Sequence, residues 1–166
     1  MVFDTRLRAG ELLGNKLLET SIGVDLVLGL SHGGVAVAKP VAAALKKPVE
    51  VLVIKKIGTP GDPELATGAW VPEGQPLDIQ DKNILLVDDG AATGASMYEA
   101  IRWVRQHKAK DVIVALPVAP SDVVATLQTL VSKVIVLEAP EDFRAVGAYY
   151  KNFPQLTDKD VVQLLA

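Results

Sequence analysis

The sequence of 166 residues contains no cysteine, and only 5% of its residues are aromatic. The lack of cysteine excludes disulfide bonds and thiolate chemistry. Hydrophobic residues nevertheless make up 49% of the chain, so its core must be built mainly from Val, Leu, Ile and Ala. A core of this composition favours parallel strands that are covered on both faces by helices.

The chain also has no excess of positive charge and no long apolar run. Its formal net charge is −3, which leaves no broad basic surface for a nucleic acid. No apolar run reaches the roughly 18 residues of a membrane-spanning helix, and the N-terminus lacks the apolar stretch of a signal peptide. We therefore expect a cytoplasmic protein that binds neither nucleic acid nor membranes.

Hydrophobic periodicity alternates between strand and helix along the chain. The predicted strands cover residues 25–30, 49–55, 83–88, 111–118 and 133–137, and the predicted helices cover residues 5–19, 34–46, 93–107, 121–130 and 158–165. This pattern predicts an α/β fold in a single domain over residues 1–166, with a central parallel sheet of about five strands flanked by helices. Residues 58–82, rich in Gly, Pro and acidic residues, are expected to form a functional loop or a disordered insertion.

The first predicted helix has Asp4 as its expected cap. Its broad apolar face is made of leucines, namely Leu7, Leu12, Leu13, Leu17 and Leu18.

The most informative segment covers residues 84–96 and reads ILLVDDGAATGAS. Its apolar run predicts a buried strand, and Asp88 and Asp89 follow at the carboxyl end, where open α/β sheets bind ligands. The small side chains of the next loop let a phosphate reach backbone N–H groups, and a helix that starts at Thr93 or Gly94 adds its N-terminal donors. The two carboxylates suit vicinal sugar hydroxyls or a divalent cation.

Other kinds of protein carry a similar acidic pair after a strand. Response-regulator receiver domains place the pair near the start of the chain, whereas here it is central. The acidic strand end also resembles that of P-loop nucleotidases. A P-loop requires G-x-x-x-x-G-K-[ST], and the nearest approach, GELLGNK at residues 10–16, has the wrong spacing inside a predicted helix. A plain structural turn is the remaining alternative.

Two further segments suit an anionic ligand. In LGLSHGGV, residues 28–35, Gly33 and Gly34 permit positive φ and close approach to the backbone, although tight turns also use glycine for packing. Next to them, His32 is either an anion donor or a surface-turn residue. Lys55 and Lys56 end a predicted strand, and one of the two should face the ligand side; an exposed strand end is the alternative.

Together these segments resemble the 5-phosphoribosyl-1-pyrophosphate (PRPP) motif of type I phosphoribosyltransferases, which consists of a strand, two acidic residues, a small loop, Thr-Gly and a helix. With LGLSHGGVAVA, VLVIKKIGTPGDPELATG and the tail EDFRAVGAYYKNFPQ, nearly the whole chain is similar to a group of predicted phosphoribosyltransferases whose acceptor is undefined. The resemblance implies a type I phosphoribosyltransferase fold with a small hood from about residues 58–82 and the chain ends. The implied reaction of nucleotide metabolism transfers the 5-phosphoribosyl group of Mg²⁺-bound PRPP to a nitrogenous acceptor, such as a nucleobase, and releases pyrophosphate. A homodimer is implied as well.

The resemblance also implies roles for individual residues. Asp88 and Asp89 would be the catalytic pair that holds the ribose 2′ and 3′ hydroxyls, and Mg²⁺ would be held mainly by PRPP, without a direct protein ligand. Phe143 would stack on the acceptor, or else anchor the C-terminal strand. The 5′-phosphate would be bound by Ala91, Ala92, Thr93, Gly94, Ala95 and Ser96. The pyrophosphate would be bound by Leu30, Ser31, His32, Gly33, Gly34, Lys55 and Lys56.

Several positions depart from the family pattern. Ser31 and His32 replace a Pro-Arg pair, so the pyrophosphate loop lacks a permanent cation. Ala92 stands where hypoxanthine-guanine phosphoribosyltransferases carry an Asp that serves the purine ring, and Lys151 stands where an Asp helps hold metal. The stretch between residues 68 and 83 is shorter than in many relatives. Ala92, the Ser31-His32 pair and the short stretch favour an alternative hypothesis, a non-catalytic regulatory protein that binds PRPP.

Overall fold

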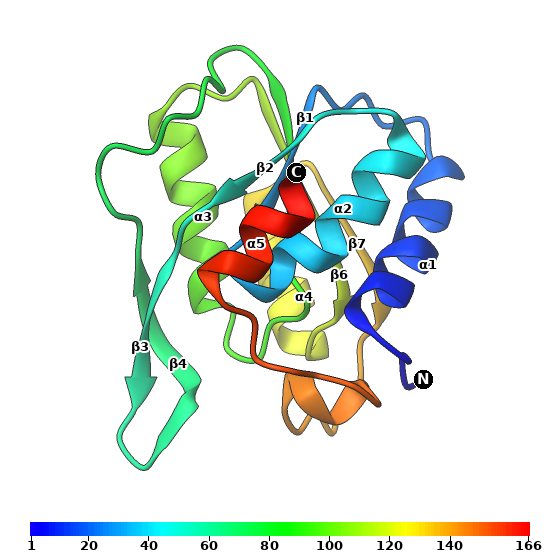
Figure 1. Ribbon diagram of the computed structural model, residues 1–166, viewed down its shortest axis with the longest axis vertical. Coiled ribbons are helices and arrows are strands. Elements are labelled where there is room, and N and C mark those ends of the chain that lie inside the picture. Colours follow the sequence, from blue (N-terminus) through cyan, green and yellow to red (C-terminus); the bar gives the residue numbers. More distant parts are fainter.

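The chain folds around a five-stranded parallel sheet (Figure 1). This computed structural model describes the backbone of residues 1–166 and the side chains of all of them except Thr59 and residues 62–67. The strand order is β2-β1-β5-β6-β7, which confirms the predicted α/β fold. The strands are β1 (Leu26–Leu30), β2 (Val49–Leu52), β5 (Asn83–Val87), β6 (Asp111–Val118) and β7 (Lys133–Glu138).

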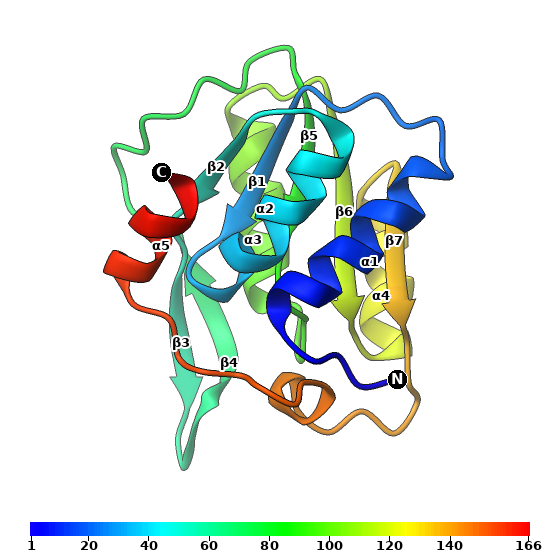
Figure 2. The same ribbon diagram turned by 45° about the vertical axis from the view of Figure 1, so that its right-hand side comes forward.

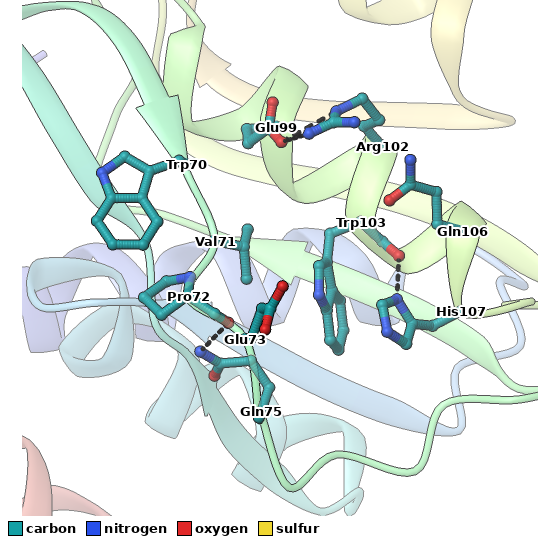
Figure 3. A pocket seen from close by; sticks show the side chains of 11 residues that line it. Trp70, Val71, Pro72, Glu73, Gln75, Glu99, Arg102, Trp103, Gln106 and His107 are labelled. Carbon is teal, nitrogen blue, oxygen red and sulfur yellow. Dashed lines mark hydrogen bonds and ion pairs between the residues drawn. The ribbon is translucent and has the colours of Figure 1, made fainter.

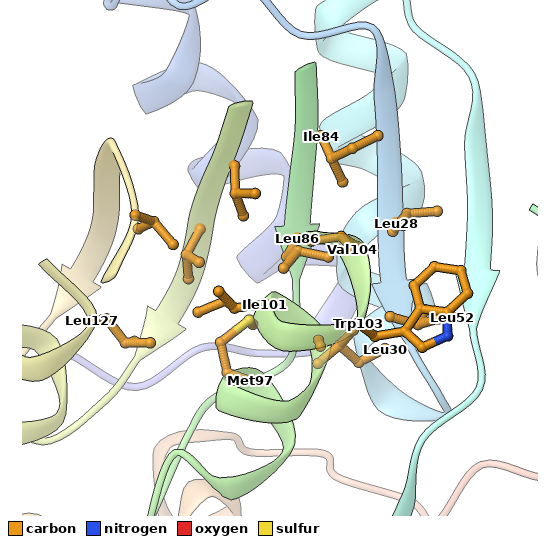
Figure 4. Packing of buried hydrophobic residues seen from close by; sticks show 14 of the residues in the cluster. Leu28, Leu30, Leu52, Ile84, Leu86, Met97, Ile101, Trp103, Val104 and Leu127 are labelled. Atoms are coloured by element: carbon orange, nitrogen blue, oxygen red, sulfur yellow. The ribbon is translucent and has the colours of Figure 1, made fainter. Parts of the chain in front are cut away.

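Helices cover both faces of the sheet, with α1 (Arg6–Leu18) and α2 (Gly33–Leu45) on one face and α3 (Ala95–Gln106) and α4 (Ser121–Leu130) on the other (Figure 2). Alternate strand residues supply the two apolar layers. Val27 and Leu85 pack toward α1 and α2, whereas Leu28 and Leu86 pack toward α3 and α4 (Figure 4). After the 3₁₀ helix η1 (Val146–Tyr149), the C-terminal helix α5 (Asp158–Leu165) lies against α2.

The predicted strand over residues 49–55 ends earlier than expected. The backbone N–H groups of Val53 and Ile54 bond to Gln75 Oε1 at 3.3 Å and to Ser31 Oγ at 3.0 Å, so they do not continue the sheet ladder. The chain then forms a separate antiparallel hairpin of β3 (Lys55–Thr59) and β4 (Asp62–Trp70), which projects from the sheet (Figure 1). Part of the segment expected to be a loop is therefore a strand.

Two helix starts also differ from expectation. Thr5, not Asp4, caps α1, because its Oγ1 accepts a hydrogen bond from the Arg8 backbone N–H at 3.1 Å. Helix α3 begins at Ala95 because Gly94 has a φ of +85°, a left-handed conformation outside the helical region. Within the part of the chain that the structure describes, no helix is long and apolar enough to cross a membrane.

Candidate functional site

The carboxyl ends of β1 and β5 lie side by side at the centre of the sheet. From β1 the chain crosses through α2 to one edge of the sheet, and from β5 it crosses through α3 toward the other edge. Open α/β sheets bind ligands at such a topological switch point. Two segments leave this switch point. We name them the glycine loop (residues 30–34) and the acidic loop (residues 88–94).

The glycine loop and the acidic loop are in direct contact. A Cβ atom added to Gly34 would lie 2.7 Å from the Val87 carbonyl oxygen and 3.0 Å from Asp88 Cα. One added to Gly33 would lie 2.1 Å from Asp89 Oδ2. Because no other side chain fits at either position without displacing its neighbours, the glycines are needed for this close approach. The structure thus brings together two segments that are far apart in the sequence.

Asp88 is a buried carboxyl group, only 4% exposed. Its Oδ1 accepts a hydrogen bond from the Asp89 backbone N–H at 2.8 Å. Burial raises the pKa of Asp88 from 3.8 to about 8, against the opposing charge of Lys56 and with a further contribution from Asp89. Perturbed carboxyl groups of this kind are typical of functional sites.

Asp89 is also buried, and it is held from two sides. Its Oδ2 accepts a hydrogen bond from Arg6 Nε at 2.9 Å, which is also an ion pair. Its backbone carbonyl accepts a hydrogen bond of 2.6 Å from the Tyr150 hydroxyl. Burial and the Asp89 carboxylate raise the pKa of Tyr150, so this hydroxyl keeps its proton and remains a donor.

Arg6 is a site residue that the sequence analysis missed. It lies on the same buried face of α1 as Ala9, Leu13 and Leu17. The sequence carries one signal for this role, namely an arginine in register with the apolar face of the helix. A charged residue on such a face needs a buried partner. The leucine face expected for this helix is only partly correct, since Leu7 and Leu18 are exposed.

In the glycine loop, Ser31 and His32 make contacts of different kinds. Ser31 is buried, and its hydroxyl bridges the backbone of Ile54, as acceptor from N–H at 3.0 Å and as donor to the carbonyl at 3.4 Å. His32 Nε2 lies 2.6 Å from Oδ1 of Asp158, the first residue of α5. The hydrogen bond with His32 lowers the pKa of Asp158. A carboxylate therefore sits beside the loop that was expected to bind an anion.

The acidic loop runs from the end of β5 into α3. The Ala91 backbone N–H bonds to the Val118 carbonyl at 3.1 Å, which ties the loop to β6. Thr93 Oγ1 accepts from the Ala95 backbone N–H at 3.3 Å, next to the start of α3. A Cβ on Gly94 would lie 2.6 Å from the Tyr98 ring. Ser96 is buried in the first turn, where helix N–H groups favour an anion.

The two lysines at the start of the hairpin face different groups. The Asp88 carboxylate raises the pKa of Lys56, so its ammonium group lies within electrostatic reach of the acidic loop. Lys55 instead contributes to lowering the pKa of Asp158. Successive strand residues point to opposite sides, which explains why the two lysines separate in this way.

Comparison with known proteins identifies the domain. A family model described as phosphoribosyl transferase domain matches residues 5–151. The chain belongs to this family. A Mycobacterium tuberculosis H37Rv protein named "Putative phosphoribosyl transferase Rv0571c" is 35% identical over 205 residues, which cover 99% of this chain and 46% of that protein. The chain thus spans about half the length of the curated relatives it matches.

Solved structures share the phosphoribosyl transferase fold. TT1426 from Thermus thermophilus is 35% identical, with a TM-score of 0.84 over 99% of this chain and 98% of that one. An adenine phosphoribosyl transferase from Trypanosoma brucei, solved with AMP, pyrophosphate and ribose-5-phosphate, is 16% identical, with a TM-score of 0.59 over 95% of this chain and 76% of that one. At that identity, the second likeness shows the fold alone.

Phe143, the expected acceptor-stacking residue of this phosphoribosyl transferase domain, is half-buried in an aromatic cluster. Its ring stacks on Tyr149, with the ring centroids 5.4 Å apart, and both rings pack against the cluster of Phe3 and Tyr150. The same segment touches the acidic loop, because a Cβ on Gly90 would lie 2.8 Å from Val146 Cγ1. The segment therefore borders the candidate site, and Phe143 packs within this segment against Tyr149.

A cavity of about 570 Å³ lies on the outer side of α3, between its C-terminal half and residues 70–75 (Figure 3). Trp70 and Trp103 line it together with Glu99 and Arg102, which form an ion pair. None of the residues expected to bind PRPP lines this cavity. The acidic loop and the glycine loop thus remain the candidate site of the domain.

Proposed function

We propose that the chain binds Mg²⁺-bound PRPP at the switch point and transfers its 5-phosphoribosyl group to a nitrogenous acceptor. One observation carries this proposal, namely the buried pair of Asp88 and Asp89 held directly against the glycine loop. Carboxylates accept hydrogen bonds from vicinal sugar hydroxyls, and backbone N–H groups at a helix start donate to phosphate. The two loops offer both kinds of group within one site.

The proposed residues divide the ligand between them. Asp88 and Asp89 hold the ribose, the acidic loop with the start of α3 holds the 5′-phosphate, and the glycine loop with Lys56 holds the pyrophosphate. In the reaction, the bond between the anomeric carbon and pyrophosphate breaks, and a bond to the acceptor nitrogen forms. The positive charge that develops at the anomeric carbon is stabilised by the nearby carboxylates, so positioning and electrostatics supply the rate.

Magnesium suits the charge balance of this site. Burial raises the pKa of the Asp88 carboxyl to about 8, and a cation bound nearby would favour its ionised form. A bound Mg²⁺ would neutralise pyrophosphate oxygens. We take PRPP as the main source of its ligands, as the resemblance to type I phosphoribosyltransferases implies.

A second candidate function is a regulatory protein that binds PRPP without turnover. Two contacts favour it. The Ser31 hydroxyl is committed to the backbone of Ile54, and the Phe143 ring is committed to Tyr149. Ala92 also lacks a side chain that could serve as a base in the loop.

Calorimetric titration with Mg²⁺-bound PRPP tests the proposal. The wild-type protein should bind, and the double substitution Asp88→Asn/Asp89→Asn should abolish binding. Asp122→Asn, at an exposed position of α4, is the matched control and should bind like the wild type. Unchanged binding by the double variant would refute the assignment of the acidic pair.

A screen of nucleobases for pyrophosphate release then separates the two candidates. An enzyme releases pyrophosphate with at least one acceptor, whereas a regulator binds PRPP and releases none. We also propose that the protein acts as a cytoplasmic homodimer in nucleotide metabolism. Sedimentation velocity tests the dimer, and a single species at 17.6 kDa would contradict it.

A further inference from the structure

Arg6 places a guanidinium group inside the buried face of α1. Its side chain is only 9% exposed. A buried charge is costly unless it is paired and fully hydrogen-bonded. The partners of Arg6 therefore decide what this residue does.

These partners come from two distant segments of the chain. Nε donates to Asp89 Oδ2 at 2.9 Å, and Nη1 donates to the Pro154 carbonyl at 2.6 Å. The guanidinium carbon also lies 3.9 Å from the centre of the Phe153 ring, within the range of a cation–π contact. Arg6 thus joins the start of α1 to the acidic loop and to the segment that precedes α5.

The planar guanidinium has a fixed direction in this arrangement. The Phe153 ring lies against the guanidinium, and the hydrogen bonds of Nε to Asp89 and of Nη1 to Pro154 limit its rotation. A Cβ on Gly33 would lie 2.8 Å from Arg6 Nε and 2.1 Å from Asp89 Oδ2, so the ion pair is packed directly against the glycine loop. The positive charge of Arg6 is therefore committed to Asp89.

We propose that Arg6 is a positioning residue, which fixes the Asp89 carboxylate in the orientation that receives a ribose hydroxyl. The inference rests on the proposed function, because it takes Asp89 as a ribose-binding residue. Arg6 engages Oδ2, so in this proposal Oδ1 is the oxygen that receives the ribose hydroxyl. A lysine cannot replace Arg6 here, because an ammonium group lacks the planar fork that reaches Asp89 and Pro154 together.

The test uses Arg6→Lys, with Arg8→Lys as the matched control. Arg8 lies on the same helix but is exposed, and it pairs only with Glu11 among the ion pairs of the described residues. Calorimetry of each protein uses three probes, namely Mg²⁺-bound PRPP, ribose 5-phosphate and inorganic pyrophosphate. We expect Arg6→Lys to bind both ribose-containing probes at least tenfold more weakly and pyrophosphate within threefold of the wild type. Arg8→Lys should leave all three affinities unchanged.

Other outcomes of the titration overturn the inference. If Arg6→Lys lowers the melting temperature but leaves the three affinities unchanged, Arg6 has only a structural role. If pyrophosphate binding falls as much as PRPP binding, Arg6 is a direct anion ligand. If the wild type does not bind Mg²⁺-bound PRPP, the proposed function itself fails. This result concerns the wild type and is therefore distinct from the two outcomes for Arg6→Lys.

A second pair of variants covers the case in which Arg6→Lys does not fold. Arg6→Met/Asp89→Asn removes both charges, so no unpaired charge stays buried. We expect its affinity for Mg²⁺-bound PRPP to lie within threefold of that of Asp89→Asn alone, because Arg6 acts through Asp89. A further tenfold loss would show that Arg6 contacts the ligand by itself and would overturn the inference.

Discussion

Replacing Asp88 with Asn should stabilise the protein at alkaline pH while it weakens PRPP binding. The side chain is 4% exposed, and its pKa of about 8 lies well above the ordinary value of 3.8. Each pKa step corresponds to about 1.4 kcal/mol, so ionising Asp88 in the fold costs roughly 5–6 kcal/mol. An Asn of the same shape avoids this cost and can still accept the bond from the Asp89 backbone N–H.

The pH dependence of the free energy of unfolding follows from the direction in which the pKa of Asp88 is shifted. Below pH 4 the Asp88 carboxyl is neutral in both the folded and the unfolded chain, so it leaves stability unchanged. Between pH 4 and pH 8 the unfolded chain loses this proton while the folded one keeps it, so the free energy of unfolding falls as pH rises. Above pH 8 the Asp88 carboxyl is ionised in both the folded and the unfolded chain, so it causes no further fall in the free energy of unfolding.

Urea unfolding followed by circular dichroism measures this difference. At pH 9 we expect Asp88→Asn to be several kcal/mol more stable than the wild type, and at pH 4 the two should agree within about 1 kcal/mol. The exposed control Asp122→Asn should change stability by no more than about 0.5 kcal/mol at either pH. An Asp88→Asn variant that is equally stable or less stable than the wild type at pH 9 would refute the reasoning that ionisation of the buried Asp88 carboxyl destabilises the fold.

Three further predictions concern the two loops. Gly34→Ala should lower the free energy of unfolding by about 1–3 kcal/mol, because its Cβ would lie 2.7 Å from the Val87 carbonyl oxygen; an unchanged urea midpoint contradicts this. Asp158→Asn removes the carboxylate beside His32, so calorimetry should show tighter binding of inorganic pyrophosphate, and weaker or equal binding contradicts it. Mg²⁺-bound PRPP should displace the proton of Asp88 and release close to one proton at pH 7, because the free carboxyl has a pKa of about 8. Titrations in buffers of different ionisation enthalpy measure this release, and an equal release by Asp88→Asn would contradict it.

The sheet, and with it the sheet edge at which the candidate site lies, could be predicted from the sequence because short apolar runs ending in polar or glycine residues recur along the chain. The run Ile84–Val87 before Asp88 places the acidic pair at a strand end, and the structure has β5 there. The small residues after each run then locate the loops. Both signals are local, so no knowledge of distant contacts was needed.

The hairpin and the role of Arg6 could not be predicted in the same way, because both depend on long-range contacts. Strand β2 stops at Leu52 because Ser31 Oγ and Gln75 Oε1 capture the next backbone N–H groups. Those partners lie far from Leu52 in the sequence. Arg6 likewise meets Asp89 and Pro154 only after both ends of the chain have packed together.

The two aspartates of the acidic loop therefore have different electrostatic partners, although they are neighbours in the sequence. Asp89 has a guanidinium in hydrogen-bond contact, whereas burial dominates the environment of Asp88 and raises its pKa to about 8. A cation that enters the site gains more from Asp88, because the charge of Asp89 is already balanced by Arg6. In the proposed reaction, Asp89 thus serves mainly as a fixed acceptor for the ribose, and the Asp88 carboxylate stabilises the positive charge that develops at the anomeric carbon.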